Sequence, residues 1–178
     1  ELVARAHELQ YAALAITDEC SVAGVVRAHT KAKELGFKLI VGSEFRLVCG
    51  LHLVVLALDR TGYGKLCRLI TRGRRAAQKG EYRLERSDVE ELLGVSADTL
   101  LLWLPGKSKT GSREQGDWLQ RCFAGRVWLA VELLRDGSER QWLTRLTELG
   151  ESLGLPLVAT GDAHMHARGR RRLQDVMT

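Results

Sequence analysis

The sequence of 178 residues lacks the signatures of several protein classes. No apolar run approaches the roughly eighteen residues that cross a membrane, and no secretory signal is visible. We therefore expect a cytoplasmic protein with no membrane partner. Cysteine is scarce, and the four residues are widely scattered without a Cys-x-x-Cys pair: Cys20, Cys49, Cys67 and Cys122. This spacing argues against a zinc knuckle and a disulfide framework, and it fits a reducing compartment.

A nucleotide-binding loop of the P-loop type is also missing. Gly106-Lys107-Ser108 follows an expected strand, but the motif needs a glycine five residues before its Gly-Lys pair, and Leu101 occupies that position. No platform for stacked bases is visible either, because the tryptophans lie in apolar surroundings and are expected in the core: Trp103, Trp118, Trp128 and Trp142. The sequence therefore gives no indication of a nucleotide crevice.

The net charge is +5, which favours a polyanionic partner such as DNA. Arginines cluster at 72–75 and at 168–172. A solvated helix face is the commoner role of such clusters, whereas phosphate contacts would give a salt-dependent attraction that ignores base sequence. The candidate nucleic-acid contacts are Arg72, Arg74, Arg75, Arg170, Arg171 and Arg172.

Apolar segments of strand and helix type alternate along the chain. Strands are expected at 12–17, 38–45, 51–58, 99–104, 127–133 and 155–160. Helices are expected at 22–35, 63–78, from 87, near 117–122, at 138–153 and from about 167, with a polar loop at 105–116. The run at 51–58 is typical of a buried parallel strand, and Ser87-Asp88-Val89-Glu90 matches a capping box. This alternation predicts an α/β fold with mostly parallel strands, either a barrel or a doubly wound sheet.

Acidic residues recur where the expected strands end. Asp18 and Glu19 follow the first strand, and the others lie late in or after later strands: Glu44, Glu132 and Asp162. Catalytic groups of parallel α/β folds gather at this edge. Because a glycine-rich phosphate turn is lacking, the pattern favours a barrel-like site. Each acid also has an ordinary structural interpretation, such as a helix cap for Asp18 or solvent contact for Glu44.

The segment Gly161-Asp162-Ala163-His164-Met165-His166 follows the last expected strand. Side chains alternate along a strand, so its acid and two histidines would share one side if the extended conformation continued. Such a set suits Zn²⁺, Mn²⁺ or iron. The alternative is a polar loop whose histidines cap a helix or contact solvent. His52, at the start of the strand expected at 51–58, also has two interpretations. It is either a metal ligand or a side chain that hydrogen-bonds a backbone carbonyl.

Four segments together resemble the polymerase-and-histidinol-phosphatase (PHP) family in order and spacing: Ala15-Ile16-Thr17-Asp18-Glu19-Cys20, Val41-Gly42-Ser43-Glu44, His52-Leu53-Val54 and Gly161-Asp162-Ala163-His164. The segments at 62–70 and 161–175 are similar to the PHP domain that opens bacterial family C DNA polymerases. Glu19-Cys20 and the motif at 162–166 look most like their error-prone branch. The resemblance covers essentially the whole chain.

This resemblance implies a distorted (β/α)₇ TIM-like barrel, with residues 1–167 as the PHP domain and 168–178 as the start of a connection toward a polymerase core. By position it implies metal ligands at Glu44, His52, Asp162 and His164. Glu19 is a further candidate, Asp18 and Glu132 are weaker ones, and His166 is unassigned. Zn, Mn or Fe at such a site activates water for phosphoester hydrolysis, whereas the parent polymerase would use Mg²⁺.

Two departures from the family pattern argue against an active metal site. The family's first His-x-His pair belongs on a strand upstream of Glu1, so we expect this chain to lack the first barrel strand, and Glu19 replaces a family histidine. From the resemblance we predict that the chain is an N-terminal PHP fragment of an error-prone DNA polymerase. The parent enzyme would be a nucleotidyltransferase of replication and translesion repair synthesis. The fragment lacks the palm, and its own role would be a structural or vestigial metal-binding module. The alternative is a metal-dependent phosphoesterase, either a proofreading nuclease or a free-standing phosphatase. Expected partners are DNA and other replication or mutagenesis proteins.

Overall fold

The structure is a computed structural model that describes residues 1–106, 112–133, 137–161 and 163–177. Its strands are β1 (Leu14–Ile16), β2 (Leu39–Arg46), β3 (His52–Ala57), β4 (Thr99–Trp103), β5 (Val127–Glu132) and β6 (Leu157–Thr160). Its helices are α1 (Leu2–Glu8), α2 (Val25–Glu34), α3 (Arg60–Arg75), α4 (Arg86–Leu93), α5 (Ser112–Phe123), α6 (Glu139–Leu153), the 3₁₀ helix η1 (Arg168–Arg170) and α7 (Arg171–Met177). In the described part of the chain, no helix is long and apolar enough to span a membrane.

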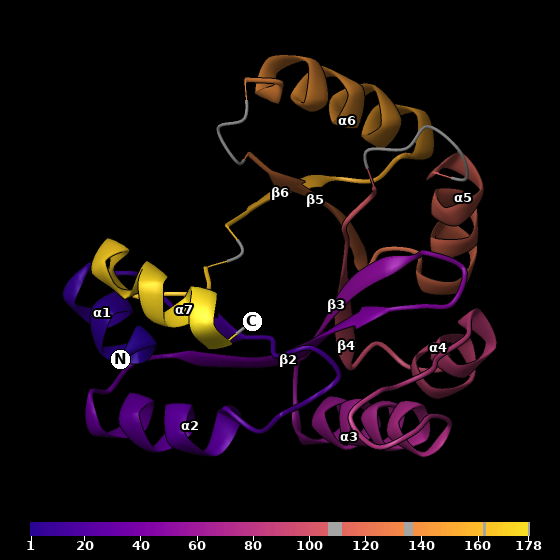
Figure 1. The fold of residues 1–178 in the computed structure, drawn as a ribbon. Coiled ribbons are helices and arrows are strands. Elements are labelled where there is room, and N and C mark those ends of the chain that lie inside the picture. The colour runs from indigo at the N-terminus through magenta and orange to yellow at the C-terminus, as the bar shows by residue number, and fades with distance from the viewer. Residues whose placement is uncertain (107–111, 134–136, 162, 178) are drawn as a thin grey trace.

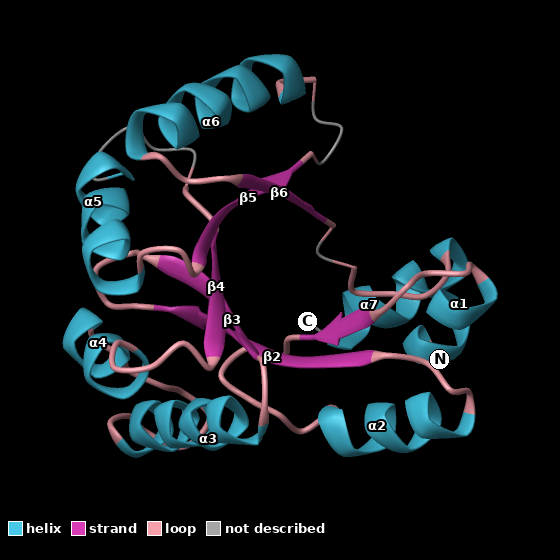
Figure 2. Ribbon diagram, turned by 180° about the vertical axis from the view of Figure 1, so that it is seen from behind, coloured by secondary structure: helices cyan, strands magenta, loops and turns pink. Residues whose placement is uncertain are grey.

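The six strands form one curled sheet whose spatial order follows the chain, from β1 to β6. Helices α2 to α6 surround its outer side, as Figure 1 shows, and α1 and α7 lie together at the open side. Within the described ranges, β1 and β6 are each paired on one side only. In a closed barrel every strand has two neighbours. The predicted barrel-type α/β fold is therefore confirmed as a curled half-barrel (Figure 2).

The predicted direction of β3 is wrong, because β3 runs antiparallel to both β2 and β4. The connection from β2 to β3 spans only residues 47–51, and the Leu47 N–H donates to the Leu51 carbonyl at 2.9 Å. A parallel connection needs a long crossover, whereas an antiparallel one needs only a short turn. The apolar run of β3 reflects burial rather than strand direction. This reversal sets the carboxyl end of β2 beside the amino end of β3.

The main core lies between the outer face of the sheet and the surrounding helices. Phe45 and Leu53 are fully buried there and belong to one apolar cluster with Leu66 and Leu69 of α3. Because strand side chains alternate between faces, the residues beside them on β2 and β3 point to the inner, concave face. Polar side chains on that face form the candidate site.

The starts of α4 and α5 are two of the helix boundaries that differ from the sequence prediction. The capping box of α4 begins at Glu85, whose side chain pairs with the backbone of Asp88, and not at Ser87. Helix α5 already begins at Ser112, inside the predicted loop at 105–116. Helix α6 ends at Gly154, which adopts the left-handed conformation with φ of 65°, as is common for a glycine that follows a helix.

A buried ion pair fastens α3 to the segment before β4. Lys65 Nζ lies 2.8 Å from Asp98 Oδ2, and the Ser96 hydroxyl donates to the same carboxylate at 2.8 Å. Burial disfavours the charged carboxylate, but hydrogen bonds from Lys65 and Ser96 outweigh this effect and hold the pKa of Asp98 below its ordinary value. Asp98 is therefore ionised in the folded protein at neutral pH.

We expect Asp98→Asn to lower the free energy of unfolding at pH 7 by about 1 kcal/mol, because Lys65 loses its ionic partner. A carboxyl whose folded pKa is depressed stabilises the fold above its unfolded pKa, and this contribution is lost as pH falls through the folded pKa. Urea unfolding between pH 7 and pH 2 should show the variant and the original protein converging only in acid. Asp117→Asn, at an exposed position on α5, is the control and should change little. A constant difference across this range would contradict the assignment.

Candidate functional site

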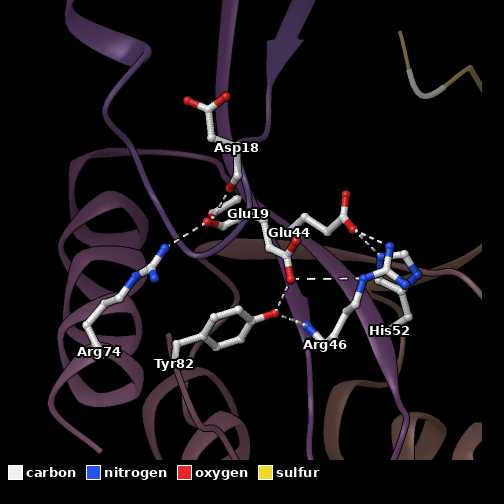
Figure 3. Close-up of polar contacts among 8 residues, drawn as sticks. Asp18, Glu19, Glu44, Arg46, His52, Arg74 and Tyr82 are labelled. Atoms are coloured by element: carbon white, nitrogen blue, oxygen red, sulfur yellow. Dashed lines mark hydrogen bonds and ion pairs between the residues drawn. The ribbon is translucent and has the colours of Figure 1, made fainter. Parts of the chain in front are cut away.

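Three polar side chains of the β2–β3 hairpin share the concave face of the sheet. Glu44 and Arg46 lie two residues apart on β2 and so point to the same side. Arg46 is paired directly with His52 across the hairpin. The antiparallel register therefore brings a carboxylate, a guanidinium and an imidazole together at the carboxyl end of β2 (Figure 3).

The Glu44 carboxylate is the centre of this group. Its Oε1 atom lies 2.6 Å from His52 Nε2 and accepts a hydrogen bond from Arg46 Nη2 at 3.0 Å. The side chains of Glu44 and His52 are each only 18% exposed. The hydrogen bond with His52 lowers the pKa of Glu44 below its usual value, and the attraction of Arg46 reinforces this against the opposing effect of burial. Glu44 is therefore an anion with two protein partners.

The segment after β1 is fastened to β2 beside Glu44. The Cys20 N–H donates to the Glu44 carbonyl at 2.8 Å, and the Glu44 N–H donates to the Asp18 carbonyl at 3.2 Å. The fully buried Ser43 adds a second attachment, because its hydroxyl donates to the Asp18 carbonyl at 2.7 Å. Glu19 and Glu44 consequently form a parallel bridge pair, which places the two carboxylates on neighbouring segments.

Glu19 has its own hydrogen-bond donor in Tyr82. The tyrosine hydroxyl donates to Glu19 Oε1 at 2.6 Å and accepts the backbone N–H of Arg46 at 2.8 Å. Burial, reinforced by the bond to Glu19, raises the pKa of Tyr82, so the hydroxyl keeps its proton. Arg46 Nε lies 4.0 Å from the same Glu19 oxygen. Tyr82 thus connects the acid to the end of β2 (Figure 3).

The sequence prediction did not include Tyr82 or Arg46. Tyr82 lies between α3 and α4, where no periodic pattern marks a functional residue. The Glu44–Arg46 spacing was a usable signal, since alternation puts both side chains on one face. Its significance becomes clear only when the hairpin brings His52 alongside.

The weaker candidate Asp18 has a structural role. Its Oδ2 atom accepts the backbone N–H of Gly24 at 3.0 Å, immediately before α2. In Figure 3 its carboxylate points away from Glu44. Asp18 thus ties the segment after β1 to the start of α2, although Gly24, and not Asp18, is the N-cap residue of that helix.

The remaining metal candidates lie elsewhere or are not described. Asp162 lies outside the described residues. Glu132 ends β5 and accepts a hydrogen bond from Thr160 of β6 at 3.2 Å. His164 is exposed, and His166 Nδ1 lies 3.4 Å from Glu1 Oε2. Strand β6 ends at residue 160, so the alternation that would align the motif does not continue as a strand.

Among the described residues, the contacts around Glu44 differ from those of ligands around a metal ion. Metal ligands aim their lone pairs at a common cation, at about 2.0–2.2 Å for zinc. Here the Glu44 and His52 ligand atoms bond to each other, and a guanidinium contacts the same carboxylate oxygen. Over the ranges that the structure describes, no group of three or more His, Cys, Asp or Glu is placed to hold a metal. Glu19, Glu44 and His52 are brought together, but as a hydrogen-bonded ionic group.

Several of the arginines predicted to contact DNA have partners within the protein. Arg72 pairs with Glu91 at 2.6 Å, and Arg170 pairs with Glu1 at 2.9 Å. Arg74 donates to backbone carbonyls, with Nε 3.1 Å from the carbonyl oxygen of Cys20. Among the six candidates, the exposed residues are Arg75, Arg170, Arg171 and Arg172. Arg72, Arg74 and Arg170 thus have protein partners, and nucleic-acid binding by the six arginines stays a prediction.

Residues 1–135 match the family model of the PHP domain. The chain belongs to the PHP domain family. Its whole length is 57% identical to part of an error-prone DNA polymerase of Methylococcus capsulatus. Comparable relatives occur in Dechloromonas aromatica at 54% identity and Pseudomonas aeruginosa at 55%. In each case this PHP chain spans only 17% of the relative's length.

Two solved structures have a fold similar to that of this chain. One is a protein from Bifidobacterium adolescentis assigned as a metal-dependent phosphoesterase, with a TM-score of 0.57, 16% identity and coverage of 94% of this chain and 82% of that one. The other is an amidohydrolase from Chromobacterium violaceum, solved with bound sulfate and no metal, with a TM-score of 0.59, 16% identity and coverage of 96% and 82%. At this identity the likeness concerns the fold alone.

Proposed function

We propose that this chain is the PHP portion of an error-prone DNA polymerase, and that it serves there as a structural module rather than as a phosphoesterase. The matches of the whole chain to part of three polymerases of that name support the parent identity. Such a parent would add nucleotides to DNA with Mg²⁺, in replication and translesion repair synthesis in the cytoplasm. DNA is its substrate, and other replication or mutagenesis proteins are proposed partners. Within the chain, residues 1–167 would form the domain, and 168–178 would begin the connection toward the polymerase core.

The observation that carries the structural role is the ionic group around Glu44. Metal-dependent hydrolysis requires a cation that lowers the pKa of water and neutralises the phosphoryl oxygens. The carboxylate best placed for such a cation already bonds His52 and Arg46. The second carboxylate, Glu19, already accepts the Tyr82 hydroxyl. These contacts join the segment after β1, strands β2 and β3, and the α3–α4 connection. Such cross-links brace the domain.

A metal-dependent phosphoesterase remains the second candidate, because Glu44 and His52 do lie together on the concave face. Zn, Mn or Fe would be the expected ions, with Asp162 and His164 as further proposed ligands. A proofreading nuclease and a free-standing phosphatase both fall within this alternative. A nuclease would remove mismatched 3′ nucleotides, whereas a phosphatase would act on a small phosphate ester.

The test is a hydrolysis assay on the intact natural protein with Mn²⁺, Zn²⁺ or Mg²⁺. Suitable substrates are a 3′-labelled mismatched primer and p-nitrophenyl phosphate. We expect the natural protein to show no more metal-dependent hydrolysis than Glu44→Gln, with the rates of these two proteins within about twofold of each other. Glu34→Gln, at an exposed position on α2, controls for the loss of one charge. Hydrolysis that Glu44→Gln and Asp162→Ala abolish and Glu34→Gln preserves would overturn the structural role.

A further inference from the structure

The Arg46 guanidinium lies where a cation is needed between two acids. It bonds Glu44 at 3.0 Å and lies 4.0 Å from a Glu19 oxygen. We propose that Arg46 takes the place of a metal ion at this site, and that its fixed charge excludes divalent cations from the Glu19, Glu44 and His52 group. This inference deepens the proposed structural function and rests on it.

The first support is that Arg46 supplies the positive charge that two neighbouring carboxylates need. The parallel bridge places Glu19 and Glu44 on neighbouring segments, and two nearby carboxylates disfavour each other's ionisation unless a cation lies between them. A guanidinium has five donors in a planar fork and can serve two carboxylates at once. Arg46 follows Glu44 by two residues on the same face of β2, so the strand itself delivers the compensating charge.

The second support is the permanence of that charge. A histidine can release its proton and become a metal ligand, but an arginine side chain stays protonated in proteins. A divalent ion entering beside Glu44 would therefore meet a positive group within hydrogen-bonding distance of the same oxygen. Coulomb repulsion acts between two like charges at such a distance, although solvent around the exposed guanidinium weakens it. Arg46 would have to move away before a metal could bind.

The third support is the anchoring of the end of β2. The Arg46 backbone N–H donates to Tyr82 at 2.8 Å, and the same tyrosine holds Glu19 at 2.6 Å. The Arg74 guanidinium stacks over the Tyr82 ring, 5.5 Å from its centroid. The backbone that carries Arg46 is therefore tied to one of the two acids that its side chain faces. Its side chain is 61% exposed, so truncation should leave the core intact.

The experiment measures binding of Mn²⁺ and Zn²⁺, each added as the only metal, to chelator-treated intact protein by titration calorimetry. We expect weak binding to the natural protein and at least about tenfold tighter binding to Arg46→Met. Arg46→Lys keeps the charge and should bind as weakly as the natural protein. Arg68→Met makes the same charge change at an exposed position on α3 and should show no gain. In Arg46→Met, the added change Glu44→Gln should abolish the gain.

Equal affinity in Arg46→Met and the natural protein would overturn the proposal, whether both bind tightly or neither binds. Far-ultraviolet circular dichroism shows that each variant is folded, and Arg46→Gln is a second neutral replacement that must give the same gain. This result is distinct from one that would overturn the structural role of the domain. Metal-dependent hydrolysis by the natural protein would overturn the structural role, whereas equal metal affinity of Arg46→Met and the natural protein would overturn the role of Arg46.

Discussion

Replacing Gly62 by alanine is expected to lower the free energy of unfolding by about 3 kcal/mol, a large effect for one methyl group. Gly62 is buried in the first turn of α3. A Cβ atom there would lie 2.0 Å from the carbonyl oxygen of Asp98. That oxygen belongs to the backbone and accepts the Leu58 N–H at 3.0 Å, so it cannot rotate away as a side chain could. Helix α3 must shift, and the adjacent Lys65–Asp98 ion pair shifts with it.

Gly64 offers a matched control two residues along the same helix. A Cβ atom there meets no heavy atom within 4 Å, and alanine is the better helix former by up to about 1 kcal/mol. Gly64→Ala should therefore be neutral or stabilising while Gly62→Ala destabilises. Urea unfolding at pH 7, followed by circular dichroism, measures both. Equal stability of the two variants would mean that α3 does not approach the segment before β4 as closely as described.

Much of the fold could be predicted because its signals are local. Apolar runs and helix periodicity placed the six strands and the larger helices, and glycine after α6 marked its end at Gly154. The direction of β3 could not be predicted in this way. A strand covered on both faces has the same apolar run whether its neighbours are parallel or antiparallel. The five-residue connection at 47–51 was the stronger signal.

The strand direction also explains why the site was only partly predictable. In a parallel sheet, His52 at the start of its strand would lie at the opposite edge from Glu44 near the end of β2. The antiparallel hairpin brings their side chains to 2.6 Å. The family resemblance named both residues as metal ligands without this geometric reason, and that role stays a prediction. Tyr82 required the tertiary arrangement, because its partner Glu19 comes from a segment whose proximity no local pattern encodes. Arg46 lies two residues from Glu44 on β2, but its significance appears only when the hairpin adds His52.

The second large effect is expected at Arg74, where methionine should lower the free energy of unfolding by about 2–3 kcal/mol. The guanidinium donates to the backbone carbonyls of Glu19 at 3.2 Å and Cys20 at 3.1 Å. On its other side it donates to the Gly80 carbonyl at 2.9 Å. Methionine preserves much of the apolar stem but leaves these carbonyls without their charged donor. The segment that carries Glu19 would loosen from the α3–α4 connection.

The neighbouring Arg75 provides the comparison, since it is exposed and its replacement by methionine should change stability by less than about 0.5 kcal/mol. If the cluster at 72–75 contacts DNA phosphates, Arg75→Met should weaken binding and reduce its salt dependence. Arg74→Met should then affect DNA binding only in proportion to its loss of folded protein. Urea unfolding and fluorescence anisotropy with duplex DNA at several salt concentrations separate these effects. An Arg74→Met protein of normal stability but weakened DNA binding would show that Arg74 contacts phosphate instead of bracing the Glu19 segment.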